Sequence, residues 1–426
     1  MPQTRTAAET AAKQRRPTGA GDAAAPLWRV WLAAWPVMAV FMLSNAATPL
    51  YTLWQHGIGF SAGTLTVVFA AYIAGLTGSL LVCGVASDRL GRKPVLLPAL
   101  TLALAACLVF ATATTVAALI TARLFTGIAV GAAVSAGMAA VTDTAGPGRK
   151  RTAALLASCA MVLGAGLGPL LAGVLCQTAP APTVTVFAAE AVLLATAALA
   201  VLRMPLPRPK THAGGGTWIR VPGVPRGNGR QLALGIAVFA PGLTATSFML
   251  SLGPTLLSHL LGTTSPTAAG AMAFAMFLTA AGVQFTVQRL PRRTILTAGA
   301  AATTLSMITL TAALHTSSAP PLALSALLAG AGQGLGQLGG LSLLNSSVPP
   351  QHLAEANAAL NTGAYLPAAV LPLCTGYLSN TIGLTNSTTA FATTLAALAL
   401  TGGLTIHASR HQVTDPTSQT TPADAT

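Results

Sequence analysis

Charge is the property that this sequence most lacks. Only 7% of its 426 residues are Asp, Glu, Lys or Arg, whereas 53% are hydrophobic. A soluble globular protein carries about 25% charged residues, so this chain cannot cover itself with a surface that water would solvate. Among the charged residues, the acidic ones are fewer, with 8 Asp and Glu against 22 Lys and Arg. The composition therefore predicts a protein that folds in lipid.

What the sequence lacks also excludes several other classes of protein. The net charge of +14 does not indicate nucleic-acid binding, because the basic residues stand in short clusters between apolar runs. The sequence contains no phosphate-binding Walker loop and no His-Glu-x-x-His zinc motif. Its 5 cysteines are scattered singly, as small apolar residues are, and predict neither disulfides nor a metal site. We expect no enzyme activity, no cofactor and no metal.

Apolar runs long enough to cross a bilayer are frequent. A transmembrane helix needs about 20 mostly apolar residues, and the sequence predicts twelve such spans, six in each half of the chain. The predicted spans are residues 31–51, 65–85, 94–114, 116–141, 153–176, 184–202, 232–252, 266–287, 295–315, 322–344, 354–377 and 387–405. The expected fold class is therefore an all-α integral membrane protein.

Polar stretches divide the chain into five parts. Residues 205–230, rich in Pro, Gly and basic side chains, predict a linker between an N-terminal bundle, 29–204, and a C-terminal bundle, 231–407. Residues 1–28 and 408–426 are polar and rich in Ala, Thr and Pro, so we expect disordered tails there.

The Lys and Arg residues predict the orientation in the membrane. Except for Arg123, all of them fall in the two tails or in the even-numbered connections between spans. Connections on the cytoplasmic side carry an excess of Lys and Arg. We therefore expect a multi-pass protein of the cell membrane, with both tails and the linker in the cytoplasm.

The two halves of the sequence also resemble each other. A shift of 200 residues lays Asp88–Leu96 over Gln288–Leu296, and a shift of 202 lays Asp143 over Asn345. A nearly constant offset indicates two parallel repeats. Transporters built from such repeats bind their substrate between the halves, near the bilayer midplane. The predicted architecture is twelve transmembrane helices in two pseudo-symmetric six-helix bundles.

The connection after the second span carries a distinctive motif, Gly84-x-x-x-Asp88-Arg89-x-Gly91-Arg92-Lys93. It resembles the loop signature of the major facilitator superfamily, and the resemblance extends over residues 29–407. The family consists of secondary transporters that work by alternating access, and in it this loop acts as a conformational latch. The resemblance implies that Asp88 faces the N-terminus of the eleventh helix and that Arg92 reaches Asp143 after the fourth. Gly84 allows close helix packing and Gly91 a tight turn. The alternative is that these charges only set topology.

Two further segments resemble the family. Arg123, inside the fourth span, matches a position that the family ties to proton transfer or substrate handling; a structural hydrogen bond is the alternative. The fifth span contains Gly164-x-x-x-Gly168-Pro169-x-x-Ala172-Gly173, with Ala172 at a position where the family has Gly. This pattern resembles that of exporters that exchange substrate for protons, although ordinary packing of small residues is an alternative. The chain thus looks most like the twelve-helix drug/proton antiporters, a group associated with multidrug resistance.

Polar residues inside the spans are candidates for the transport site. A proton-coupled carrier usually needs a titratable group in the membrane, and Glu190 is the only acid well inside a predicted span. We therefore expect Glu190, with Arg123, to couple protons, although the sixth helix is usually peripheral in this fold. Other side chains are candidates either for lining a substrate cavity or for hydrogen bonds between helices: Asn45, Gln284, Gln333, Gln337, Asn361 and Tyr365.

The function expected from the sequence is secondary active transport of a small, neutral or amphipathic molecule by proton-coupled efflux. An uptake symporter or facilitator for a nutrient is one alternative, and a non-transporting receptor on the same scaffold is another. The expected partners are the small-molecule substrate, protons and the lipid bilayer, with no nucleic acid. We expect the protein to function as a monomer.

Overall fold

The described part of the protein is helical throughout. The computed structural model describes residues 26–146, 149–206, 218, 223–262, 264–349 and 352–409, and no strand occurs among them. The first half contains α2 (Leu27–Ala46), α3 (Tyr51–Trp54), α4 (Ala62–Leu90), α5 (Lys93–Ala111), α6 (Val116–Ala132), α7 (Met138–Ala145), α8 (Lys150–Thr178) and α9 (Pro182–Arg203). The second half contains α10 (Gly229–Ser251), α11 (Gly253–Leu261), α12 (Pro266–Thr286), α13 (Arg292–Thr316), α14 (Ala319–Ser347), α15 (Leu353–Ile382) and α16 (Leu384–Ala408).

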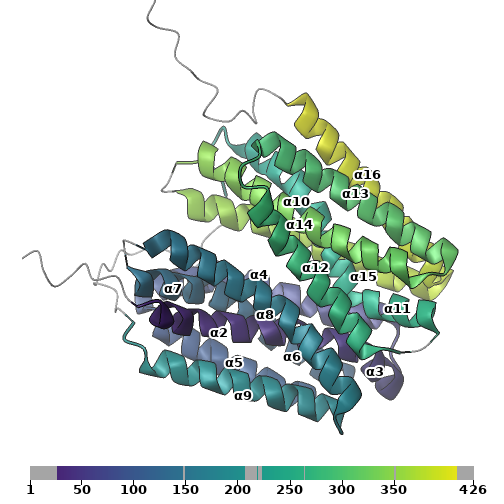
Figure 1. Cartoon of the computed structure of the whole chain (residues 1–426), viewed down its shortest axis with the longest axis horizontal. Coiled ribbons are helices and arrows are strands. Elements are labelled where there is room, and N and C mark those ends of the chain that lie inside the picture. The colour runs from purple at the N-terminus through teal and green to yellow at the C-terminus, as the bar shows by residue number, and fades with distance from the viewer. Residues whose placement is uncertain are drawn as a thin grey trace, which may run out of the picture.

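The helices of the two halves form two bundles that lie side by side. In Figure 1, α2 to α9 make the lower group and α10 to α16 the upper one. Most of the predicted tails, 1–28 and 408–426, and much of the predicted linker, 205–230, lie outside the described residues.

The twelve predicted spans correspond to twelve long helical segments. Of these, 10 are long and apolar enough to cross a membrane. The other two, α14 and α15, have 29 and 30 residues but are more polar. Gly, Ser and Gln residues lower the apolarity of α14, and Asn and Thr residues lower that of α15. The predicted architecture of twelve membrane helices in two bundles is therefore consistent with the fold.

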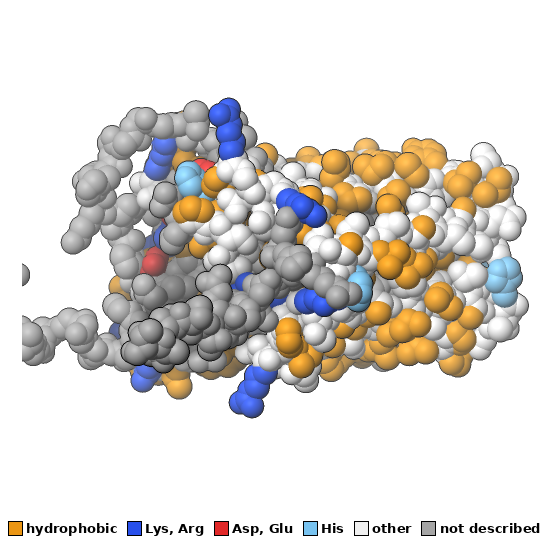
Figure 2. Space-filling model, turned by 90° about the horizontal axis from the view of Figure 1, so that it is seen from above, with side chains coloured by type: hydrophobic (Ala, Val, Ile, Leu, Met, Phe, Trp, Pro, Cys, Tyr) orange, Lys and Arg blue, Asp and Glu red, His pale blue; other side chains and the backbone are white. Residues whose placement is uncertain are grey.

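The bundles have two chemically different ends. α2 begins and α16 ends at one of them, where Lys93 starts α5 and Arg203 ends α9. We call this the basic end, and the other the opposite end. Figure 2 shows Lys and Arg side chains gathered toward one end and hydrophobic side chains over much of the remaining surface. Large apolar side chains such as Leu108, Val192 and Leu404 are exposed, as expected for a surface that faces lipid.

The first helix of each half continues beyond its predicted end. After α2 the chain forms a 3₁₀ turn, η1 (Thr48–Leu50), then α3 and a π-helical turn, η2 (Gln55–Gly59). After α10 it continues as α11. Proline stands at the start of the new segment in both cases, Pro49 in η1 and Pro254 in α11. Proline interrupts an α-helix because it has no N–H to donate, and helical structure then resumes through polar residues that the sequence analysis placed outside the membrane.

Glycine allows the helices within each half to pack backbone against backbone. A methyl group on Gly127 of α6 would lie 2.1 Å from the carbonyl oxygen of Tyr72 in α4. In the second half, a methyl group on Gly330 of α14 would lie 2.1 Å from the carbonyl oxygen of Met276 in α12. Atoms cannot approach so closely, so only glycine fits. Small residues of this kind dominate helix contacts in membranes.

Candidate functional site

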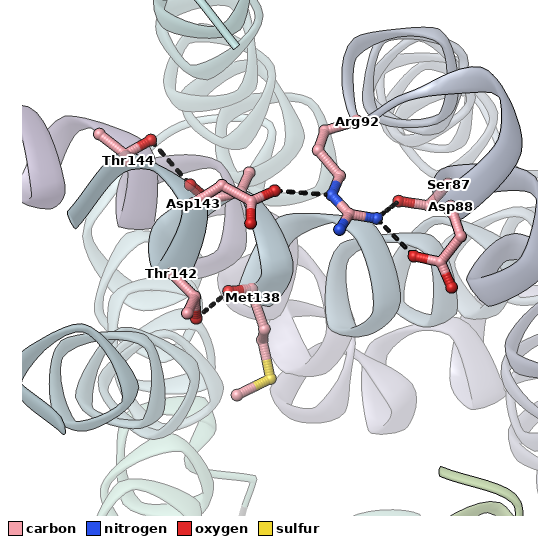
Figure 3. Close-up of polar contacts among 8 residues, drawn as sticks. Ser87, Asp88, Arg92, Met138, Thr142, Asp143 and Thr144 are labelled. Atoms are coloured by element: carbon pink, nitrogen blue, oxygen red, sulfur yellow. Dashed lines mark hydrogen bonds and ion pairs between the residues drawn. The ribbon is translucent and has the colours of Figure 1, made fainter. Parts of the chain in front are cut away.

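The loop between α4 and α5 holds a network of charged groups at the basic end (Figure 3). Gly91 turns the chain there with a φ of +99°, a conformation that glycine adopts without strain. The Arg92 guanidinium lies between two carboxylates, because its Nη1 donates to Asp88 Oδ1 at 2.8 Å and its Nε to Asp143 Oδ2 at 2.9 Å. Nη1 also donates to the hydroxyl of Ser87 at 2.8 Å. The network ties the end of α4 to α7.

The surroundings of Arg92 favour its charged form. Burial lowers the pKa of Arg92, but hydrogen bonds to Asp88 and Asp143, together with the charges of both carboxylates, more than offset this effect and raise it above its ordinary value. Hydrogen bonds in which both groups are charged are stronger than neutral ones. Arg92 is therefore held as a fixed cation between two helix ends.

The other residues of the loop motif contact neighbouring segments. The Arg89 guanidinium lies 4.8 Å from the centroid of the Trp218 ring, a cation–π contact. Lys93 Nζ donates to the carbonyl oxygen of Leu202 at 2.9 Å. This contact is favourable because the carbonyl groups at the end of α9 carry partial negative charge. Gly84 lies half-buried in the last turns of α4.

Arg123 lies fully buried inside the first half, in a cage of aromatic rings. Its Nη1 donates to the carbonyl oxygen of Ser44 in α2. Its Cζ lies 5.0 to 5.9 Å from the centroids of four rings, those of Tyr51, Phe69, Tyr72 and Phe110. Nε and Nη2 are buried without a hydrogen-bond partner. Aromatic faces attract the guanidinium, but two of its nitrogens have unused donor capacity.

The cage reaches the boundary between the two halves. Tyr72 of α4 lies close enough to Tyr365 of α15 for the two groups to interact electrostatically. Arg123 and Tyr365 were expected at the site from the sequence, whereas Tyr51 and Tyr72 were not. The scarcity of tyrosine, with 4 in the whole chain, is the signal that could have pointed to them.

The glycine motif of α8 first serves contacts within the first half. A methyl group on Gly164 would lie 2.4 Å from the carbonyl oxygen of Met38, and one on Gly168 would lie 2.0 Å from that of Met42. Both carbonyl groups belong to α2. The first two glycines of the motif therefore allow α8 to pack directly on the α2 backbone.

The end of the same motif contacts the second half. A methyl group on Gly173 would lie 2.4 Å from the carbonyl oxygen of Pro266, and one on Gly270 would lie 2.2 Å from that of Pro169. Pro266 and Gly270 belong to α12. Pro169 and Gly173, at the end of the pattern that resembles exporters, thus lie at the contact between the two bundles.

Further contacts join the halves at the opposite end. Asn380 Nδ2 of α15 donates to the hydroxyl of Ser61, which precedes α4, at 3.3 Å. The Thr255 hydroxyl of α11 donates to Gln55 Oε1 of η2 at 3.2 Å. With the contact between α8 and α12, three pairs of segments therefore close the two halves against each other at this end.

Some of the polar residues selected from the sequence come together in the second half. Gln284 Nε2 of α12 lies 3.5 Å from Gln337 Oε1 of α14. One turn away on α14, Gln333 Oε1 is buried without a hydrogen-bond partner. These three amides form a polar patch between two helices whose neighbouring side chains are mostly apolar.

Two of the remaining selected residues bond to backbone carbonyl groups, one in another helix and one in its own. Asn45 Nδ2 donates to the carbonyl oxygen of Ala165 at 3.3 Å, so it joins α2 to α8. Asn361 Nδ2 donates to the carbonyl oxygen of Asn357, one turn earlier in α15, at 2.9 Å. The structure thus places Asn45 in a helix contact, apart from the glutamine patch.

Glu190 is the one buried carboxyl group among the described residues. It is 1% exposed, and neither of its oxygens has a hydrogen-bond partner. Cys107 of α5 lies close enough for the two groups to interact electrostatically. Neither Glu190 nor Arg123 bonds to the other, so the structure does not bring the two proposed coupling residues into contact.

An aromatic stack lies between Glu190 and the opposite end. The rings of Trp54, Phe110 and Phe187 stack with centroid separations of 4.7 to 6.0 Å. Phe187 precedes Glu190 by three residues on α9, so both side chains lie on one face of that helix. Phe110 also contacts Arg123. The stack therefore covers Glu190 on one side and borders the cage of Arg123 on the other.

Comparison with models of protein families identifies one family. The sequence model of the Major Facilitator Superfamily matches residues 30–283 and 232–423. No curated protein matches the sequence. Among solved structures, a bacterial homolog of the human lysosomal transporter Spinster, inward-facing and unoccupied, is 14% identical with a TM-score of 0.72, and the match covers 91% of this chain and 98% of that one.

Two other solved structures share this fold. The xylose transporter XylE from E. coli, in an inward open conformation, is 14% identical with a TM-score of 0.69, covering 88% of this chain and 96% of its own. The nucleoside transporter NupG is 13% identical with a TM-score of 0.69, covering 89% of this chain and 98% of its own.

Gly173→Ala should open the contact between α8 and α12. The added methyl group has no room beside Pro266, and overpacking of this kind costs about 1–3 kcal/mol. Since the cost arises only while the halves are closed at the opposite end, the ratio of open to closed molecules should rise at least about fivefold. The rate at which a bulky thiol reagent labels a cysteine placed at Ser61 measures this ratio.

The matched control is Gly282→Ala on α12, where a methyl group would meet nothing within 4 Å. It should leave the labelling rate unchanged. Equal labelling of the two variants would show that Gly173 is not required for closure.

Proposed function

Since this chain belongs to the Major Facilitator Superfamily, we propose that it exports a small, neutral or amphipathic molecule from the cytoplasm in exchange for protons. The family and the fold are those of membrane transporters that work by alternating access. Exchange for protons and export are our proposal, and the observation that carries it is Glu190, a buried carboxyl group without a partner. The glycine pattern of α8 supports the direction.

The proposed orientation places the basic end in the cytoplasm. Connections rich in Lys and Arg stay on that side. Contacts between the halves, such as Asn380 to Ser61 and Thr255 to Gln55, lie at the opposite end. This arrangement supports a state that receives its substrate from the cytoplasm.

The substrate site proposed here lies between the halves, around Tyr72 and Tyr365. Arg123 offers two buried N–H donors next to Tyr72, and the glutamine patch of α12 and α14 offers amides. The surrounding rings supply apolar contact, and in such sites a few polar groups set the orientation of the ligand. No carboxylate other than Glu190 is buried in the described chain. An uncharged molecule that accepts hydrogen bonds fits these groups best.

Glu190 is proposed as the proton carrier, and the aromatic stack as its gate. Trp54 belongs to α3, and the next residue, Gln55, bonds to Thr255 of the other half. When the halves separate at the opposite end, this bond breaks and α3 becomes free to move. Movement of Trp54 away from Phe110 and Phe187 would let water reach the carboxyl group. Proton access is thereby linked to the position of the two halves.

The loop between α4 and α5 is proposed as the latch of the other state, in which the halves are closed at the basic end and open at the opposite end. Its ion pairs form a rigid unit at the basic end, where the second half must close when the opposite end opens. The side chain of Asp88 is 55% accessible, and in this proposal it contacts the second half when the basic end closes.

Export itself can be tested with inside-out membrane vesicles. A deletion strain screened for hypersensitivity to many compounds first identifies a substrate. Vesicles containing the protein should then accumulate that substrate when a proton gradient is imposed, and an uncoupler should abolish the accumulation. A tag at either terminus should be accessible on the outside of such vesicles, which controls for orientation. Accumulation only in right-side-out vesicles would show uptake and contradict export.

Glu190→Gln should abolish accumulation driven by the proton gradient but leave substrate binding and downhill exchange intact. Glutamine has nearly the same shape but cannot carry the proton. The matched control is Glu355→Gln, because Glu355 is an exposed carboxyl group at the basic end, 3.4 Å from His352, and should be dispensable. Uncoupler-sensitive accumulation at the wild-type level in Glu190→Gln would eliminate Glu190 as the carrier.

Asp88→Asn should slow transport severalfold while the protein inserts and folds normally. Exposed ion pairs contribute only about 0–1 kcal/mol to stability, so losing the charge should affect closure more than folding. Asp88→Glu keeps the charge and should retain more transport than Asp88→Asn. Wild-type rates from correctly inserted Asp88→Asn protein would contradict a latch at this position.

A further inference from the structure

The same short motif occurs in both halves, at the opposite end. Thr52–His56 follows α2 and η1, and Thr255–His259 lies in the helix that follows α10. Both segments read Thr-Leu-x-x-His, at a shift of 203 residues. The shift agrees with that of the other repeats, so the two histidines occupy equivalent positions in the two bundles. The proposed transport cycle uses neither of them.

The structure brings the two motifs together at one cleft between the halves. His56 and His259 both line this cleft, which has a volume of about 510 Å³. The hydrogen bond of 3.2 Å between Thr255 and Gln55 Oε1 joins the two segments beside it. Both imidazoles are exposed. This hydrogen bond lies next to His56 in the first segment and one helical turn before His259 in the second.

The ring of His56 is oriented as in a metal ligand. Its Nδ1 lies 2.7 Å from the carbonyl oxygen of Thr52, and because a carbonyl oxygen only accepts, Nδ1 must donate. The neutral ring then has its lone pair on Nε2. Histidines that bind metals usually donate their other ring N–H in this way, which fixes the orientation of the ring.

The chemistry of the cleft selects the class of ion. None of its described lining residues is Asp, Glu, Lys or Arg. Mg²⁺ and Ca²⁺ prefer carboxylate and carbonyl oxygens, whereas imidazole suits Zn²⁺, Cu²⁺ and Ni²⁺. The described residues contain no group of three or more His, Cys, Asp or Glu side chains suited to a metal, so water would supply the remaining ligands in this open cleft.

We propose that a divalent transition-metal ion binds between His56 and His259. One ligand comes from each half, so the site is complete only while the halves are closed at the opposite end. Binding therefore favours that state over the one in which the halves separate, because a ligand shifts an equilibrium toward the state that it prefers. The consequence for transport depends on the proposed alternating access, whereas the binding itself does not.

Zinc titration of the purified full-length chain, prepared without a polyhistidine tag, tests the site. Calorimetry should show one Zn²⁺ per wild-type chain. His56→Gln and His259→Gln should each weaken binding at least about tenfold, since loss of even an outer-shell partner costs 10–100-fold. His315→Gln is the matched control, because His315 is an exposed histidine at the end of α13, at the same end of the bundle, and it should bind Zn²⁺ like the wild type.

The double variant distinguishes a bridging ion from two independent histidines. If one ion bridges the rings, either single change removes nearly the whole effect and the double variant adds little. Zn²⁺ should likewise raise the thermal unfolding temperature of the wild type and His315→Gln but not of the other variants. Additive losses, or binding unchanged in His56→Gln, would overturn the proposal. The Zn²⁺ measurements need no substrate. If they show no binding, the proposed export is unaffected, and if the transport assay fails, the result on Zn²⁺ binding still holds.

Discussion

Close contact between helix backbones is the constraint on which this structure depends. Lipid gives two apolar helices no hydrophobic reason to associate, so van der Waals contact and hydrogen bonds must hold them together. The contact is achieved with glycine: Gly127 against Tyr72 and Gly168 against Met42 leave no space for a methyl group. The first contact joins α4 to α6, the helices that carry Tyr72 and Arg123, so close backbone packing helps to enclose the buried arginine.

Scarcity of charge gives each charged group an identifiable place. At the basic end, Arg92 lies between two carboxylates and helps to fix the ends of helices. Inside the bundle, Arg123 and Glu190 are buried apart from each other, and the aromatic stack of Trp54, Phe110 and Phe187 extends from the cage of one to the cover of the other. Burying a charged group inside the membrane costs free energy that a neutral side chain would not. This chain has few charged residues, yet it keeps these two in the interior. That cost is the physical argument for giving them a role in transport.

Much of the fold could be predicted from the sequence, because lipid requires long apolar helices and the basic residues mark every second connection. The site was less predictable. The resemblance of the loop motif to the family implied that Arg92 reaches Asp143, and the two side chains do form an ion pair. Spacing could not show that Asn45 bonds to α8 or that Arg123 is enclosed by rings, because these contacts depend on how helices rotate against each other. Segments that begin with proline, such as α11, are not predicted from apolar runs, because proline interrupts the preceding helix and polar residues follow it.

The two ends of the protein hold the halves together by different means. At the opposite end the contacts are glycine against backbone and single hydrogen bonds such as Thr255 to Gln55, and no described carboxylate lies there. A hydrogen bond contributes only about 0.5–1.5 kcal/mol net, and water can replace it when the halves part. Closure at this end is therefore weak in energy and depends mainly on shape. At the basic end the charged network of Arg92 lies within one half, and we propose that Asp88 contacts the other half when this end closes. The balance between the two states thus depends on a few small contacts at one end and a few charges at the other, which is the condition under which a substrate or a proton can shift it.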